Sequence, residues 1–143
     1  MTGTILLVED SEDDIELTRR ALNKNNLTNP LTVARDGQEA LDYLLGDGTT
    51  TPAEPPAMVL LDLQLPRVGG LEVLRRLRAN ARTRLLPIII LTSSKEDRDL
   101  LEGYTYGANS YIRKPVDFAQ FTEAVRQLGL YWLILNEAPP NVG

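Results

Sequence analysis

Carboxylate, hydroxyl and amine side chains follow short apolar segments at separate places in this 143-residue chain. Glu9 and Asp10 follow the first such segment, and Asp62, Thr92 and Lys114 follow later ones. Neighbouring carboxylates repel each other unless a cation lies among them, and Mg²⁺ takes oxygen ligands of this kind. A carboxylate can also accept a phosphoryl group, whose negative charge a hydroxyl and an ammonium group stabilise. The residue types therefore indicate Mg²⁺-dependent phosphoryl chemistry.

Taken one at a time, these residues also have plain structural interpretations. An acidic pair or a threonine can cap a helix, and a Lys-Pro pair commonly lies in a loop. Capping accounts for each residue separately, but it does not explain why carboxylates and a cation follow strands that end at the same edge of a sheet. The combination therefore favours a shared site.

The composition excludes several other kinds of chemistry. The sequence contains no cysteine and no histidine, which removes disulfides, thiolate zinc sites and histidine-dependent catalysis. Its 15 Lys and Arg residues against 20 Asp and Glu residues give a net charge of −5, which argues against nucleic acid as the main partner. No apolar run approaches the roughly 18 to 20 residues that span a bilayer, and the first residues, MTGTILLVED, have no cleavage-like segment. We therefore expect one cytoplasmic domain without membrane contact.

Short apolar runs alternate with segments of helical period, and this alternation predicts an α/β fold. The runs, typical of buried strands, lie at 5–8, 31–34, 58–61, 88–91 and 111–112. The predicted helices lie at about 12–25, 38–45, 71–80 and 95–106, with a last one that begins near Asp117. Ser11 and Asp14 resemble a capping box before the first helix. Five strand–helix pairs predict a doubly wound parallel sheet, in which the carboxyl ends of the strands meet at one edge.

Five separated motifs resemble the receiver domain of two-component response regulators. They are LLVEDSEDD, VARDGQEAL, VLLDLQLPRVGGLEVL, IIILTSS and ANSYIRKPVD. The resemblance implies a flavodoxin-like fold, with five parallel strands in the order 2-1-3-4-5 and five helices, the last one extended by an apolar tail. It also implies a single receiver domain over 1–143, with its core at about 4–128 and a C-terminal extension at 129–143.

The resemblance assigns a role to each residue of the acidic group. Asp62 is then the phosphoacceptor, which takes the phosphoryl group from a phosphohistidine of a partner kinase. Glu9 and Asp10 match the acidic pair that binds Mg²⁺, and the backbone carbonyl of Gln64 completes the metal shell. Lys114 pairs with Asp62 and later with the phosphoryl oxygens. Such a protein catalyses its own phosphotransfer and slow autodephosphorylation without being a free-standing enzyme.

Three further residues match features of the same family. Thr92 and Tyr111 match its switch pair, in which the hydroxyl moves to the phosphoryl group as the aromatic ring moves inward. Pro115 implies a cis peptide bond after Lys114. These assignments predict that phosphorylation changes the surface near the last helix.

The chain continues past the last helix with six apolar residues, LYWLIL, before NEAPPNVG. This tail and the loop 46–56, GDGTTTPAEPP, resemble single-domain regulators of bacterial phytochromes, particularly cyanobacterial ones. That resemblance implies a light-sensing histidine kinase as partner and a homodimer through the last helix and tail, with Phe121, Val125, Leu128, Tyr131, Trp132 and Ile134 at the interface. The loop itself is expected to be an exposed spacer or, alternatively, a partner contact.

Two other functions remain open at this point. The chain could be a docking module that keeps the receiver fold and signals without phosphorylation, although such a module need not retain Asp62, Thr92 and Lys114 together. It could also be a phosphatase with an aspartyl nucleophile. Such enzymes usually carry a second Asp two residues after the first, and Gln64 stands there.

Overall fold

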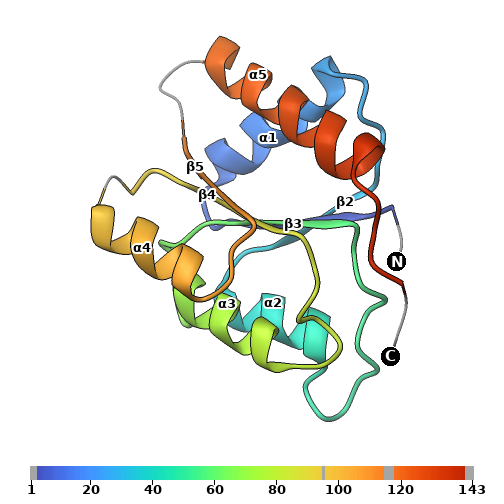
Figure 1. The fold of residues 1–143 in the computed structure, drawn as a ribbon, viewed down its shortest axis with the longest axis vertical. Helices are drawn as coiled ribbons and strands as arrows, with labels where there is room; N and C mark the ends of the chain where they lie inside the picture. Colours follow the sequence, from blue (N-terminus) through green and yellow to red (C-terminus); the bar gives the residue numbers. More distant parts are fainter. Residues whose placement is uncertain (1–2, 95, 115–117, 141–143) are drawn as a thin grey trace.

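Five short parallel strands form one sheet in the computed structural model, which describes residues 3–94, 96–114 and 118–140 (Figure 1). The strands are β1 (Ile5–Val8), β2 (Leu31–Ala34), β3 (Met58–Leu61), β4 (Ile88–Thr92) and β5 (Ser110–Arg113). They lie in the order β2-β1-β3-β4-β5. The predicted flavodoxin-like order is therefore confirmed.

Helices cover both faces of the sheet (Figure 1). On one side lie α1 (Glu12–Lys24) and α5 (Phe118–Leu128), and on the other lie α2 (Gly37–Leu45), α3 (Gly70–Ala79) and α4 (Asp97–Thr105). The predicted cap of the first helix is confirmed, because the hydroxyl of Ser11 accepts a hydrogen bond from the Asp14 N–H at 3.3 Å. None of the described helices combines the length and hydrophobicity that crossing a bilayer requires.

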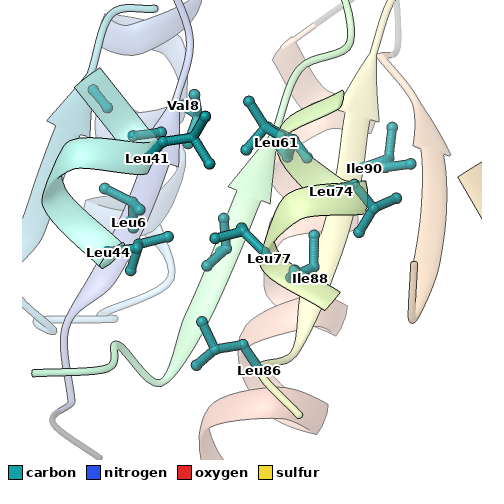
Figure 2. Close-up of a cluster of buried hydrophobic side chains, with 14 of the residues drawn as sticks. Leu6, Val8, Leu41, Leu44, Leu61, Leu74, Leu77, Leu86, Ile88 and Ile90 are labelled. Atoms are coloured by element: carbon teal, nitrogen blue, oxygen red, sulfur yellow. The ribbon is translucent and has the colours of Figure 1, made fainter. Parts of the chain in front are cut away.

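Two apolar clusters hold the helices against the sheet, because neighbouring residues of a strand point to opposite faces. One cluster lies between the sheet and α2 and α3. Figure 2 labels ten of its side chains: Leu6, Val8, Leu41, Leu44, Leu61, Leu74, Leu77, Leu86, Ile88 and Ile90. The alternate residues Ile5 and Leu7 face the other cluster, which includes Phe121 of α5. Because fully burying one such side chain contributes about 1.5 to 3 kcal/mol, these clusters hold the helices firmly against the sheet.

The tail continues α5 as a π-helical segment, η1 (Gly129–Leu135). This extension agrees with the prediction, but half of the predicted dimer surface is wrong. Phe121, Val125 and Leu128 are almost fully buried inside the chain's own core, and of these three only Leu128 reaches the groove beside Tyr131. Tyr131 and Ile134 are exposed, whereas Trp132 is partly buried against the core.

The segment 46–56 joins α2 to β3, and its residues 47–51 are exposed. Asp47 accepts hydrogen bonds from the N–H groups of Thr49 and Thr50 at 2.8 and 3.0 Å, which order the turn locally. The role of this loop as a spacer or partner contact stays a prediction. The predicted cis peptide bond at Pro115 lies outside the described residues.

Candidate functional site

The carboxyl ends of four strands bring the predicted site residues to one edge of the sheet. Val8 and Leu61 are paired in register, so Glu9 and Asp62, the residues that follow them, leave the sheet side by side. The strand pairing continues past the strand ends, because Asp62 N–H donates to the Val8 carbonyl at 3.1 Å and Lys114 N–H donates to the Thr92 carbonyl at 2.8 Å. The backbone pairing alone therefore brings these residues to the same edge of the sheet.

Lys114 lies at the centre of the site and contacts three carboxylates. Its Nζ donates to Glu9, to Asp14 at 2.8 Å and to Asp62 at 3.1 Å. The lysine side chain is only 11% exposed. Burial alone would lower its pKa, but the hydrogen bonds to Asp14 and Glu9 and the charges of Asp62 and Glu9 outweigh burial and raise the pKa. The amine therefore stays a cation.

The Asp62 carboxylate is buried and receives hydrogen bonds on both oxygens. Oδ1 accepts from the Thr92 hydroxyl at 2.8 Å and from the Gln64 N–H at 3.0 Å, and Oδ2 accepts from Lys114. Burial raises the pKa of Asp62, but the Gln64 N–H, the Lys114 charge and the Thr92 hydroxyl together hold it below its ordinary value. The Asp62 carboxylate is therefore held ionised and in a fixed orientation.

Glu9 differs from Asp62 because burial dominates its titration. Its side chain is 3% exposed. Its Oε2 accepts from the N–H groups of Asp10 and Ser11 at 3.1 and 3.3 Å. Burial raises its pKa to about 7, although the hydrogen bond and the charge of Lys114 act in the opposite direction. Glu9 therefore titrates near neutral pH, well above the range of an ordinary glutamate.

Three carboxylates of the site can reach one cation. Oxygens of Glu9, Asp10 and Asp62 all lie within 4.8 Å of one another. Two of these residues are buried, whereas Asp10 is exposed and opens the group to solvent. A donor set made only of oxygens fits a hard divalent ion such as Mg²⁺, which keeps some of its water ligands.

Thr92 and Tyr111 lie on adjacent strands but differ in the hydrogen bonds that their hydroxyl groups make. Thr92 is fully buried and donates to Asp62. The hydroxyl of Tyr111 is also buried, and it has no hydrogen-bond partner among the described residues. The ring of Tyr111 packs closely on Gly103 of α4, where an added Cβ would lie 3.2 Å from the ring. The absence of a side chain at Gly103 therefore gives Tyr111 room between α4 and the sheet.

The structure brings Glu9, Asp10, Thr92 and Lys114 together around Asp62, whereas Tyr111 packs against α4. It also adds one residue that the sequence analysis missed. That residue is Asp14, which the sequence identifies only as part of a helix cap. The signal that could have found it is its position four residues after Asp10, in the first turn of the helix that follows the acidic pair. The side chain of Gln64 is exposed, and its Oε1 accepts from the Ser93 hydroxyl at 3.1 Å, so it lies over the same edge.

The sequence and the fold are similar to those of known signalling proteins. The profile of the response regulator receiver domain family matches residues 5–126. The probable methanogenesis regulatory protein FilR2 of Methanothrix harundinacea is 41% identical over 138 residues, which are 94% of this chain and 86% of that protein.

Two cyanobacterial proteins of solved structure superpose closely. The Mn²⁺-bound form of response regulator Rcp1, known from Synechocystis, has a TM-score of 0.88 and 30% identity over 96% of this chain and 99% of that chain. The phosphorylated phytochrome response regulator RcpA has a TM-score of 0.87 and 29% identity over 98% of this chain and all of that chain.

Proposed function

This chain belongs to the response regulator receiver domain family, and we propose that it accepts a phosphoryl group on Asp62 in a two-component phosphorelay. The observation that carries the proposal is the state of the Asp62 carboxylate. It is buried and ionised, and the Thr92 hydroxyl and the Lys114 ammonium orient it beside further acids. A docking module without phosphoryl chemistry would gain nothing from burying this charge, which costs stability unless it is paired.

The transfer itself needs one nucleophile and groups that stabilise charge. A carboxylate oxygen of Asp62 attacks the phosphorus of a phosphohistidine, and an O–P bond forms as the P–N bond breaks. The electron pair of the broken bond stays on the histidine nitrogen, and a ring protonated on its other nitrogen leaves as neutral imidazole. Lys114 and Thr92 then donate hydrogen bonds to the oxygens of the transferred group.

We propose that Glu9, Asp10 and Asp62 hold a Mg²⁺ ion together with the backbone carbonyl of Gln64. When bound, Mg²⁺ supplies positive charge beside the oxygens of the transferred group. The convergence of carboxylate oxygens within 4.8 Å supports this assignment, as does the similarity to Rcp1, whose structure contains Mn²⁺. Calorimetric titration with Mg²⁺ tests it, and Asp10→Asn should weaken binding while Asp47→Asn, in the exposed loop, should not.

The proposed phosphodonor is the histidine kinase of a phytochrome-type photoreceptor. The similarity to RcpA, a cyanobacterial phytochrome response regulator, supports this choice because it extends over nearly the whole chain, including the tail. Donor and acceptor must share a compartment, so we also propose the cytoplasm as the place of action. Phosphotransfer from an autophosphorylated phytochrome kinase should exceed transfer from a kinase of another sensor class at equal concentration.

We propose that Thr92 and Tyr111 transmit the phosphorylated state. The hydroxyl of Thr92 already donates to the acceptor carboxylate, and Tyr111 lies on the adjacent strand with a buried hydroxyl that has no partner among the described residues and has one to gain. Thr92→Val removes the hydroxyl while keeping the shape. The NMR signals of Tyr111 should move on phosphorylation in the native protein and stay in place in this variant.

We propose a homodimer through the exposed part of the tail. Leu130, Tyr131, Ile134 and Leu135 are between 42% and 65% exposed, and they are contiguous with a groove between β5 and α5. An apolar surface of this kind favours association. Ile134→Asp should halve the mass measured by sedimentation, whereas Leu101→Asp, at an equally exposed leucine of α4, should leave it unchanged. A monomeric native chain would contradict the proposal.

Incubation with Mg²⁺ and acetyl phosphate tests the central proposal. Intact-protein mass spectrometry should detect one added phosphoryl group, and Asp62→Asn should abolish it, whereas Asp47→Asn should not. No uptake by the native chain under any Mg²⁺ condition would favour the docking module instead.

A further inference from the structure

Asp14 contacts the lysine of the site, although it belongs neither to the proposed acceptor nor to the carboxylates that converge on a cation. Its Oδ2 accepts from Lys114 Nζ at 2.8 Å, which is shorter than the 3.1 Å distance from the same nitrogen to Asp62. The described carboxylates that can reach one cation are Glu9, Asp10 and Asp62. Asp14 is therefore a separate anchor for the amine.

The first turn of α1 holds this carboxylate in place. The Asp14 N–H donates to the Ser11 hydroxyl at 3.3 Å, and the Asp14 carbonyl accepts from the Thr18 hydroxyl at 2.8 Å. The next residue, Ile15, is buried in the core. Since the backbone on both sides of Asp14 is fixed, its side chain presents a pre-oriented acceptor to Lys114.

The other two carboxylates beside Lys114 have further tasks in the proposed function, on which this inference rests. Glu9 is a proposed metal ligand, and Asp62 becomes an acyl phosphate when it takes the phosphoryl group, so the negative charge beside the lysine then lies on the phosphoryl oxygens instead of the carboxylate. Of the three, Asp14 alone is neither a proposed metal ligand nor the proposed acceptor, so its carboxylate serves only the lysine. An ammonium group on a long flexible side chain needs such a fixed partner in order to stay aimed at one point.

We propose that Asp14 is a positioning residue that holds the Lys114 ammonium beside Asp62 while the phosphoryl group is transferred. It touches neither phosphorus nor the attacking oxygen and acts through the lysine. A simpler interpretation is that Asp14 only stabilises the start of α1, since acidic residues are favourable in the first turn of a helix. Asp13 distinguishes the two interpretations. It is exposed in the same turn, and the carboxylates that contact Lys114 in the described part of the chain are those of Glu9, Asp14 and Asp62.

Phosphorylation rates of three variants test the role directly. Asp14→Asn should slow uptake from acetyl phosphate in Mg²⁺ about fivefold, because a partly exposed ion pair no longer steadies the lysine in the transition state. Asp13→Asn removes the same charge from the same turn and should stay within about twofold of the native rate. Asp14→Glu should restore most of the native rate. Equal rates for the two asparagine variants would overturn the proposal.

A double-mutant cycle with Lys114→Met checks that Asp14 acts through the lysine. In the Lys114→Met background, Asp14→Asn should have no further effect on the rate or on the affinity for beryllofluoride, a phosphoryl mimic measured by calorimetry. Independent effects of the two substitutions would overturn the proposal. If the native chain takes up no phosphoryl group at all, the proposed function itself fails, and this inference fails with it.

Discussion

The buried Glu9 should make the stability of the metal-free protein fall as the pH rises. An unfolded chain releases the proton of a glutamate near pH 4.5, whereas burial holds the pKa of Glu9 at about 7 in the fold. Between these values the folded protein binds one proton more than the unfolded chain. The contribution of Glu9 to stability is therefore fully present below about pH 4.5 and is lost as the pH rises through about 7.

The size of the effect follows from the two pKa values. They correspond to about 3 kcal/mol over the full range and to about 2.5 kcal/mol between pH 5 and pH 8. Other titrating groups also change the free energy of unfolding with pH. The informative quantity is therefore the difference in that free energy between the native protein and Glu9→Gln, which cannot titrate at this position. The native protein should lose about 2.5 kcal/mol relative to that variant over this interval.

Urea denaturation in EDTA at several pH values measures this difference. Glu16→Gln is the matched control, because Glu16 is an exposed acid on α1 and its replacement should leave the native pH dependence unchanged. The affinity for Mg²⁺ should also rise with pH up to about 7, since the ion must replace the Glu9 proton. Parallel stability curves for the native protein and Glu9→Gln would refute the reasoning.

Two paired substitutions test the packing that positions the site. A Cβ at Gly70 would lie 2.2 Å from the Asp62 carbonyl oxygen, whereas Gly69 has open space around it. Gly70→Ser should therefore lower the free energy of unfolding by about 2 kcal/mol, and Gly69→Ser, at the position that caps α3, should be neutral or stabilising by thermal denaturation. Leu77→Ala in the core should cost about 3 kcal/mol in urea denaturation, whereas Leu85→Ala at a half-exposed site should cost less than about 0.5 kcal/mol.

The sequence predicts the central strands well because both of their faces are buried. The runs at 5–8 and 58–61 coincide with β1 and β3, since a strand covered on both sides must be apolar throughout. Strand β5 is longer than the two residues predicted, because this edge strand includes Ser110 and Arg113. Polar residues at an edge give no apolar signal, so pairing with β4 decides the bounds.

The sequence predicts those residues of the site that directly follow a strand. Asp62 and Lys114 are found because each follows a strand in a parallel sheet, but Asp14 is not, because its partner is 100 residues away and its local pattern is fully explained by a cap. The dimer surface is overestimated for a related reason. Phe121 and Val125 form one stripe of a helix, and helical spacing alone cannot tell whether such a stripe faces the core or a second chain.

Strand β5 lies next to three parts of the molecule: the residues around Asp62, the proposed switch residue Tyr111 and the tail. Lys114 follows its last residue, Tyr111 points to the cluster shared with α2 and α3, and Ile112 points to the opposite cluster, where Trp132 of the tail packs. Pairing with β4 restrains only one side of this strand, because it lies at the edge of the sheet. A shift of Lys114 toward a phosphoryl group therefore pulls on a strand that is hydrogen-bonded to a neighbouring strand on one side only. We expect that shift to reach α4 through Tyr111 and the tail through Ile112, on opposite faces of the sheet.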